Sequence, residues 1–116
     1  MGAIVSYSQN KYMQVAGSTT DTSGGVVIPN GEVIAPYHFR GNGSDPSAYV
    51  ALVWDYGGAS ETILASTRGD ISIEFDPSIT SNQFTGNGVK TLNVILINDS
   101  GTTSQIIGGA WEAVKL

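Results

Sequence analysis

Few residues in this sequence could perform catalysis. His38 is the only histidine and there is no cysteine, so a zinc site built from several His or Cys side chains is excluded. No serine lies in a Gly-x-Ser-x-Gly elbow, and a hydrolytic triad is not expected around a single histidine. We expect His38 to have a structural or surface role and the chain not to be an enzyme.

Two pairs of carboxylates could in principle serve glycoside hydrolysis, which needs one acid and one base or nucleophile. Asp55 and Glu61 flank a Gly-Gly turn, and Glu74 and Asp76 are two residues apart in a predicted strand. The second pair faces water in that strand, and a short chain has little room for a substrate cleft. We therefore expect no catalytic residues in either pair.

Two loops are rich in oxygen ligands of the kind that calcium prefers. They are residues 42–45 (Asn-Gly-Ser-Asp) and 98–101 (Asn-Asp-Ser-Gly). The same residue types form ordinary β-turns, and the sequence favours that interpretation without deciding it. No metal and no cofactor are expected.

Aromatic side chains offer a third kind of chemistry, the stacking of sugar rings. The candidates are Trp54, Tyr56 and Trp111, with Tyr37 and Tyr49. Large aromatic residues in a β-protein more often fill the core or anchor an interface. We expect a core or interface position for these five residues and keep ligand stacking as the alternative.

The charge of the chain argues against nucleic acid as a partner. The net charge is −5, and the five basic residues are scattered, so the basic patch of a nucleic-acid-binding protein is missing. No apolar stretch reaches the length of about 18 residues that marks a membrane span. The first residues lack the basic and apolar regions of a signal peptide, and the compartment stays open.

The composition predicts strands joined by tight turns. Charged residues make up only 13% of the chain and glycine is abundant, which suits strands better than exposed helix faces. Turn signals recur at strand spacing. The expected strands of the main domain, residues 26–116, are residues 26–28, 33–39, 49–56, 62–67, 71–76, 91–97, 104–107 and 110–114. The last two are either separate strands or one strand with a bulge.

Seven to nine short strands indicate an all-β, antiparallel β-sandwich of jelly-roll or immunoglobulin-like topology. Residues 1–25 differ, because a polar stretch at residues 17–25 follows two short apolar pieces. They could form an extended N-terminal arm with a flexible joint, or a first strand followed by a surface loop. The sequence leaves both possibilities open.

Two strands are apolar on both faces, around Ala48–Trp54 and at residues 94–97. One face of such a strand meets the core, and the other should be covered as well. Covering about 200 Å² of apolar surface is worth about 5 kcal/mol. The cover could come from the same chain or from a second subunit. We favour a subunit, with Ile95 and Ile97 as interface candidates.

Low charge, Gly/Ser/Thr/Asn-rich β-structure and a possible arm are similar in character to small structural proteins of virions and bacterial surface assemblies. We therefore expect a non-enzymatic assembly module that acts as a homo-oligomer, for example a capsid decoration, head or tail component. The alternative is a carbohydrate-binding or adhesion module that uses exposed aromatic residues.

Overall fold

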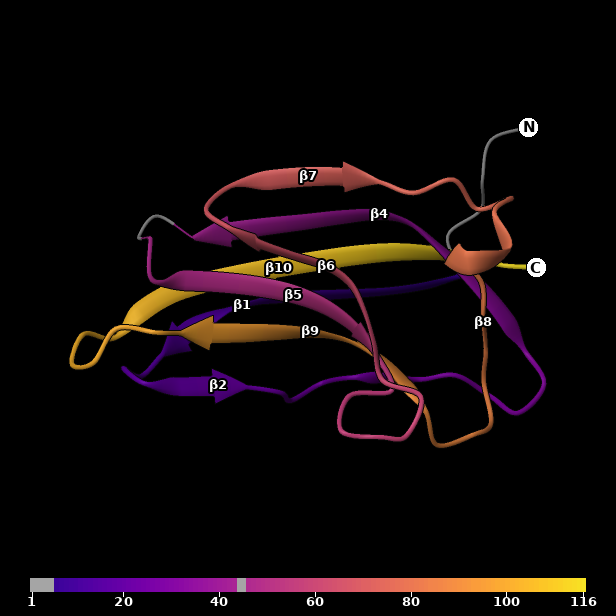
Figure 1. Cartoon of the computed structure of the whole chain (residues 1–116), viewed down its shortest axis with the longest axis horizontal. Helices are drawn as coiled ribbons and strands as arrows, with labels where there is room; N and C mark the ends of the chain where they lie inside the picture. Colours follow the sequence, from indigo (N-terminus) through magenta and orange to yellow (C-terminus); the bar gives the residue numbers. More distant parts are fainter. Residues whose placement is uncertain (1–5, 44–45) are drawn as a thin grey trace.

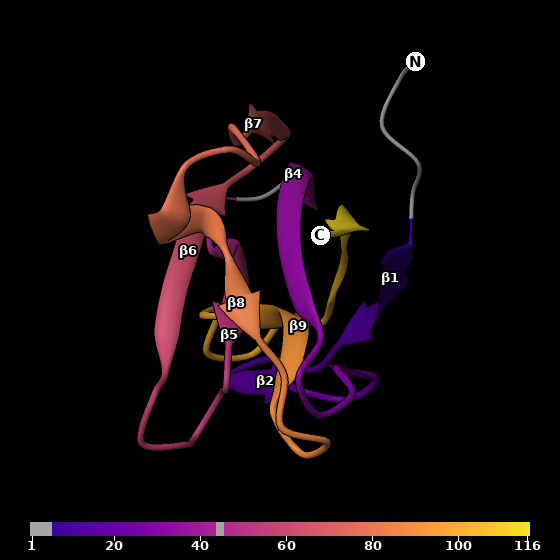
Figure 2. The same cartoon turned by 90° about the vertical axis from the view of Figure 1, so that its right-hand side faces the viewer.

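The computed structural model describes residues 6–43 and 46–116, and it forms two antiparallel sheets packed face to face (Figure 1). Sheet A has the order β1 (Tyr7–Val15), β10 (Gln105–Lys115), β4 (Val33–Gly43) and β7 (Ile71–Glu74), with β8 (Phe84–Thr85) also paired to β4. Sheet B has the order β2 (Thr19–Asp21), β9 (Thr91–Asn98), β5 (Ala48–Trp54) and β6 (Thr62–Arg68), with β3 (Val26–Val27) also paired to β9. Figure 2 shows β4, β10 and β1 on one side of the sandwich and β6, β5, β9 and β2 on the other.

The strand order decides between the two sandwich topologies. If β2 and β3 are counted as one strand and the two-residue β8 is left out, eight strands remain. The first strand then pairs with the last, β1 with β10, and the second with the second last, β2 and β3 with β9. The third strand pairs with the sixth, β4 with β7, and the fourth with the fifth, β5 with β6. This nested pairing across two sheets is the jelly roll.

The first residues of the described chain belong to both sheets. β1 pairs with β10 along nine residues, and β2 pairs with the end of β9. Residues 7–15 and 19–21 are thus strands of the sandwich, and residues 1–5 lie outside the described part. Helical structure in the described ranges is confined to one 3₁₀ turn, Thr80–Asn82, which is far too short to cross a bilayer.

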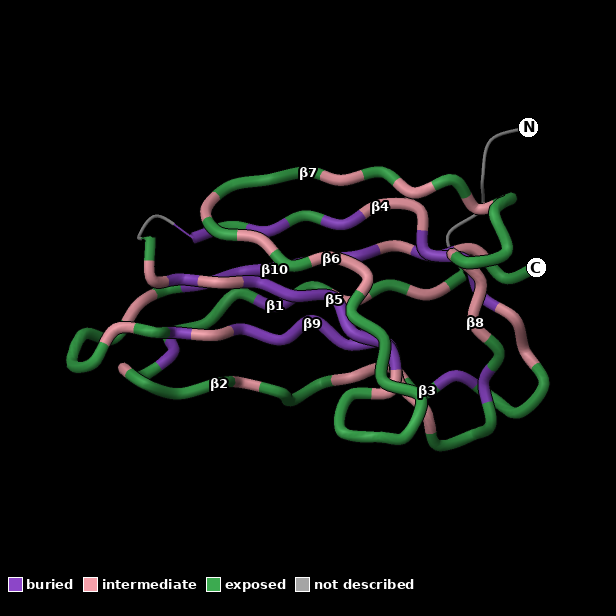
Figure 3. Tube along the Cα trace, in the orientation of Figure 1, coloured by how far each residue is buried: buried purple, intermediate pink, exposed green. Residues whose placement is uncertain are grey.

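The core lies between the two sheets. The buried stretches fall mainly on β5, β9 and β10 (Figure 3). The largest fully buried side chains include Trp111, Phe39, Ile28, Ile34, Leu52 and Leu92. Trp54 is only 4% exposed and its ring lies 5.3 Å from that of Phe84, centroid to centroid. Burial of this area is the main stabilising term of the fold.

The outer face of sheet B carries a second, smaller apolar cluster. Ala51, Val53 and Ile95 form it, and the half-buried Ile97 packs against it. Ile95 is only 2% exposed within the single chain. These side chains are therefore already shielded from water within the single chain. Their burial does not require a second subunit to cover this face.

Two side chains of β1 complete the edge of sheet B. The pairing of β9 with β2 and β3 is interrupted between Leu92 and Leu96, so the backbone of Val94 needs other partners there. Gln9 Oε1 accepts a hydrogen bond from Val94 N, and Lys11 Nζ donates one to Val94 O, both at 2.8 Å. These bonds tie sheet A to sheet B at this edge.

Candidate functional site

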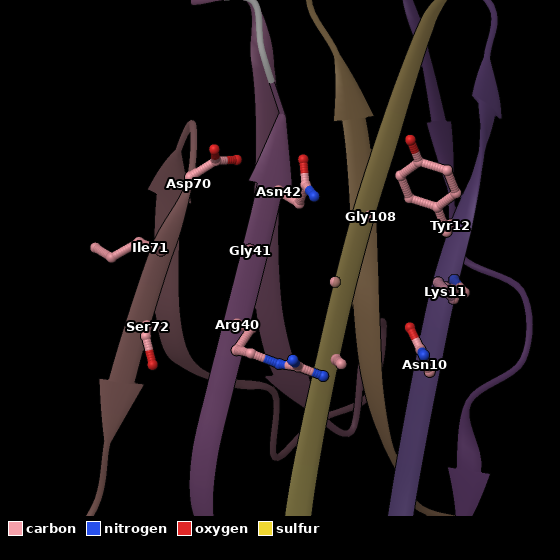
Figure 4. Close-up of a pocket in the computed structure, with 12 residues that line it drawn as sticks. Asn10, Lys11, Tyr12, Arg40, Gly41, Asn42, Asp70, Ile71, Ser72 and Gly108 are labelled. Carbon is pink, nitrogen blue, oxygen red and sulfur yellow. The ribbon is translucent and has the colours of Figure 1, made fainter.

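A groove of about 620 Å³ lies on the outer face of sheet A (Figure 4). This volume is within the range of small-molecule sites, about 300–1,000 Å³. Four strands line it, and the side chains that project around it include Asn10 and Tyr12 from β1, Arg40 and Asn42 from β4, and Asp70 in the turn just before β7. The groove is the candidate functional site.

The floor of the groove exists because the central strand β10 carries small residues. A Cβ atom at Gly108 would lie 2.7 Å from Tyr12 Cδ2, so only glycine lets the Tyr12 ring rest over β10. Gly109 points the other way, into the core, where a Cβ atom would lie 2.6 Å from methyl carbons of Val50 and Val94. The Gly-Gly pair is thus needed on both faces of the sheet.

Strand register places the lining residues in two rows across the sheet. Tyr12, Gly108 and Asn42 face one another in the first row. The second row is made of Asn10, Ala110, Arg40 and Ser72. With neighbouring strands about 4.8 Å apart, the longer row spans about 14 Å, so the groove can extend past a single sugar ring.

The polar side chains of the groove have unused hydrogen-bonding capacity. Within the part of the chain that the structure describes, the side chains of Asn10, Tyr12, Arg40, Asn42 and Asp70 make no hydrogen bond or ion pair. All five are exposed, and the Tyr12 side chain is the most open aromatic, at 69%. A ligand in the groove would therefore meet free donors and acceptors on both walls.

At the edge of the groove, from Ser72 outward, polar side chains on the same face bond to each other instead. Tyr37 Oη donates to Glu112 Oε2 at 3.0 Å, and the Nε2 atom of His38 lies 2.8 Å from the Ser72 hydroxyl. Burial of the Tyr37 hydroxyl, followed by its bond to Glu112, raises the pKa of Tyr37. These four residues form a polar network over β4, β7 and β10, whose two hydrogen-bonded pairs meet at a 3.6 Å contact between His38 Nδ1 and Glu112 Oε1.

The order Ser72, His38, Glu112 resembles the arrangement of a hydrolytic triad, but its geometry does not support that chemistry. The nearest Glu112 oxygen is 3.6 Å from His38 Nδ1, beyond hydrogen-bond reach. Ser72 is exposed on a strand at the edge of the sheet, where water is not excluded, and an activated nucleophile also needs donors for the oxyanion. The network is best explained as a stabilised surface.

The residues predicted as site candidates lie away from the groove. Trp54 and Trp111 are core residues, and the Trp111 side chain is 1% exposed. Tyr49 is half-buried on sheet B, with the Arg68 guanidinium carbon 4.2 Å from its ring centroid. Tyr56 is 48% exposed in the turn after β5. Ile95 and Ile97 form the outer cluster of sheet B.

The carboxylates Asp55 and Glu61 hold their own loop together. Asp55 Oδ2 accepts a hydrogen bond from Ser60 N at 3.0 Å, and Glu61 Oε2 accepts one from Gly57 N at 2.6 Å. Each carboxylate therefore stabilises the turn between β5 and β6. This use explains their spacing without a substrate.

The oxygen-rich loops are only partly within the described structure. Asn98 is buried and its side chain bonds to Val15 O, Thr103 O and Ser100 N, as turn residues do. Positions 44 and 45 of the other loop lie outside the described residues. Across residues 6–43 and 46–116, no group of three or more His, Asp or Glu side chains is placed to hold a metal ion.

The groove cannot be recognised in the sequence, because its residues come from four strands that only the fold brings together. The one available signal is the sequence Gly108-Gly109-Ala110, which indicates either a break between two strands or a bulge within one. Comparison of the chain with models of known protein families and with curated proteins gives no match. The chemistry of the groove is therefore the basis on which a function can be assigned.

Proposed function

We propose that the chain is a non-catalytic carbohydrate-binding module whose groove on sheet A holds a short oligosaccharide. The observation that carries this proposal is the exposed Tyr12 ring over the glycine floor, next to the free amides of Asn10 and Asn42. A sugar ring has an apolar face that stacks on an aromatic ring, and hydroxyl groups that need both donors and acceptors. The groove offers all three features within two adjacent rows.

The proposal changes which aromatic residue stacks on the sugar. Trp54 and Trp111 are in the core and have no free face for a ligand. Tyr12 is on the outer face of sheet A and its hydroxyl has no partner among the described residues. Stacking is therefore assigned to Tyr12.

Replacing Tyr12 with alanine is expected to weaken glycan binding roughly tenfold. About 60 Å² of ring face covered by the sugar, at about 25 cal/mol per Å², corresponds to about 1.5 kcal/mol. A panel of immobilised oligosaccharides identifies ligands, and isothermal titration calorimetry then gives the Kd for both proteins. Tyr56→Ala is the matched control, since Tyr56 is exposed outside the groove. Equal loss in both variants, or no ligand in the panel, would contradict the proposal.

A second proposal, a homo-oligomeric structural module of a virion or surface assembly, is favoured by the outer edge of β1, which pairs with no strand of the described residues. This nine-residue strand is the end strand of sheet A, and it carries the exposed side chains of Tyr12 and Met13. Open edges pair readily with another strand. Two copies joined through β1 would form one continuous sheet with two-fold symmetry.

Light scattering after size exclusion, at several concentrations, tests this second proposal. A stable oligomer that becomes monomeric in the Met13→Lys variant is the expected result, since a charge on an edge strand opposes pairing. Assembly through β1 would also crowd the groove at Tyr12, so the measured mass shows which proposal applies in solution. A monomer at all concentrations removes the assembly proposal and leaves the groove free for its ligand.

A further inference from the structure

We infer that the groove selects an acidic oligosaccharide, one whose sugar ring carries a carboxylate, and that Arg40 binds this carboxylate. The inference rests on the proposed carbohydrate-binding function and names the class of sugar. Three observations support it: the position of Arg40 in the groove, the fact that the other cations already have partners, and the way a guanidinium group binds a carboxylate.

Arg40 lies where a ligand in the groove would meet it. In the second row it faces Ala110 on one side and Ser72 on the other. Figure 4 shows its side chain extending from β4 over β10, towards the strand that carries Asn10. Because Ala110 is small, the guanidinium group can lie along the floor of the groove and present its N–H donors to the open side.

Arg40 is also the one cation without a partner in the described part of the chain. Lys11 pairs with Asp21 at 2.9 Å and Lys115 with Glu32 at 3.0 Å. The Lys90 ammonium donates to the Ser60 hydroxyl, and the Arg68 guanidinium lies over the Tyr49 ring. The chain has twice as many acidic as basic residues, so an unpaired arginine in a groove indicates that its partner is a ligand.

The chemistry of this site favours a single carboxylate over a more highly charged group. A guanidinium binds a carboxylate through two parallel hydrogen bonds. No second cation of the described chain is free to join Arg40, and Asp70 lines the same groove. Asp70 can accept hydrogen bonds from sugar hydroxyls, but it repels a second anionic group. A uronate with neutral hydroxyls towards β7 fits both residues.

Matched pairs of ligands test the inference with the full chain. The probes are oligomers of galacturonate, guluronate and mannuronate, three to six residues long, each with its neutral form in which the carboxyl groups are reduced to alcohols. For at least one pair, calorimetry at low salt is expected to show tenfold or tighter binding of the acidic form. This advantage should shrink at 0.5 M salt, because the attraction between exposed charges is screened.

Arg40→Gln is expected to abolish the preference for the acidic form and to change the Kd of the neutral form less than about twofold. Arg68→Gln is the matched control, since Arg68 is engaged with Tyr49 on the other sheet, and it should keep the full preference. Tyr12→Ala should weaken the acidic and neutral forms alike. The two roles, stacking and charge recognition, are thereby measured separately.

The outcomes that overturn the inference differ from those that overturn the proposed function. Equal binding of acidic and neutral forms by the unmodified chain overturns the role of Arg40 but leaves carbohydrate binding intact. Preference for a sulfated oligosaccharide over the uronates overturns the carboxylate assignment alone. Absence of binding to every oligosaccharide overturns the proposed function, and this inference with it.

Discussion

Replacing Trp111 with alanine is expected to lower the free energy of unfolding by about 3–5 kcal/mol. The side chain is buried between the sheets, on β10 between Gln9 of β1 and Phe39 of β4. Its Nε1 atom also donates a hydrogen bond to Gln9 Oε1 at 2.8 Å. Truncation would leave a large cavity and remove this donor. Urea unfolding followed by circular dichroism measures the loss.

A loss of this size is a large part of the stability of a small domain, which is about 5–15 kcal/mol, so the alanine variant could fail to fold. Trp111→Phe keeps most of the volume and removes only the N–H donor, and a cost of about 1–2 kcal/mol is expected. A cost below about 1 kcal/mol for Trp111→Ala would contradict a core position. Tyr56→Ala, in an exposed turn, should be nearly neutral.

The core positions of Trp54 and Trp111 determine what their variants can show in a binding experiment. If Trp54→Ala or Trp111→Ala lost glycan binding, the loss would follow from unfolding, because both side chains are in the core. Tyr12 and Arg40 are exposed and can be replaced without a cavity. Only variants of such exposed residues report on the groove.

Much of the fold could be predicted from the sequence because strand patterns and turn residues are local signals. The predicted strand at residues 49–56 is β5, Ala48–Trp54, and the pair 104–107 and 110–114 is the single strand β10. The jelly-roll order could not be predicted, because it depends on pairings such as β1 with β10, which are distant in sequence.

The groove could not be predicted for the same reason. Tyr12 and Asn42 come close only because β1 and β4 both pair with β10 in a fixed register. A shift of one residue in either strand would turn these side chains into the core. In the sequence, Arg40 was one of five scattered cations, and its lack of a partner became visible only when the other four were placed.

The strands β5 and β9 are apolar on both faces. Apolar residues on both faces of β5 and β9 led to the expectation of a covering subunit. The structure shields Ala51, Val53 and Ile95 within one chain. Small and branched side chains on central strands are hidden largely by the residues next to them on the same face, so a two-sided apolar strand does not by itself predict an interface.

Replacing Lys11 with methionine is expected to lower the free energy of unfolding by about 2–4 kcal/mol. Lys11 is 9% exposed, and its ammonium group binds both the Asp21 carboxylate and Val94 O. Methionine keeps the apolar stem but leaves Val94 O without its donor and Asp21 without its counter-charge. Lys90→Met is the matched control, because among the described residues Lys90 Nζ bonds only to the Ser60 hydroxyl, at an exposed site. A similar small loss in both variants would show that the Lys11 contacts add little.

The ion pair between Lys11 and Asp21 also makes the stability of the fold depend on pH. The direction of this dependence follows from the pKa of Asp21. The hydrogen bond from Lys11, opposed by burial and assisted by Ser23, holds the pKa of Asp21 below its usual value. The ionised carboxylate therefore stabilises the fold above the unfolded pKa of about 3.9, and this contribution is lost as the pH falls through the lower folded value. Asp21→Asn should be less stable than the unmodified chain at pH 7, and the difference should shrink as the pH falls below the unfolded pKa and through the lower folded one. A difference that is constant from pH 7 to pH 3 would mean that the charge of Asp21 does not contribute, and that the two sheets are held at this edge by Gln9 and by the Lys11–Val94 bond alone.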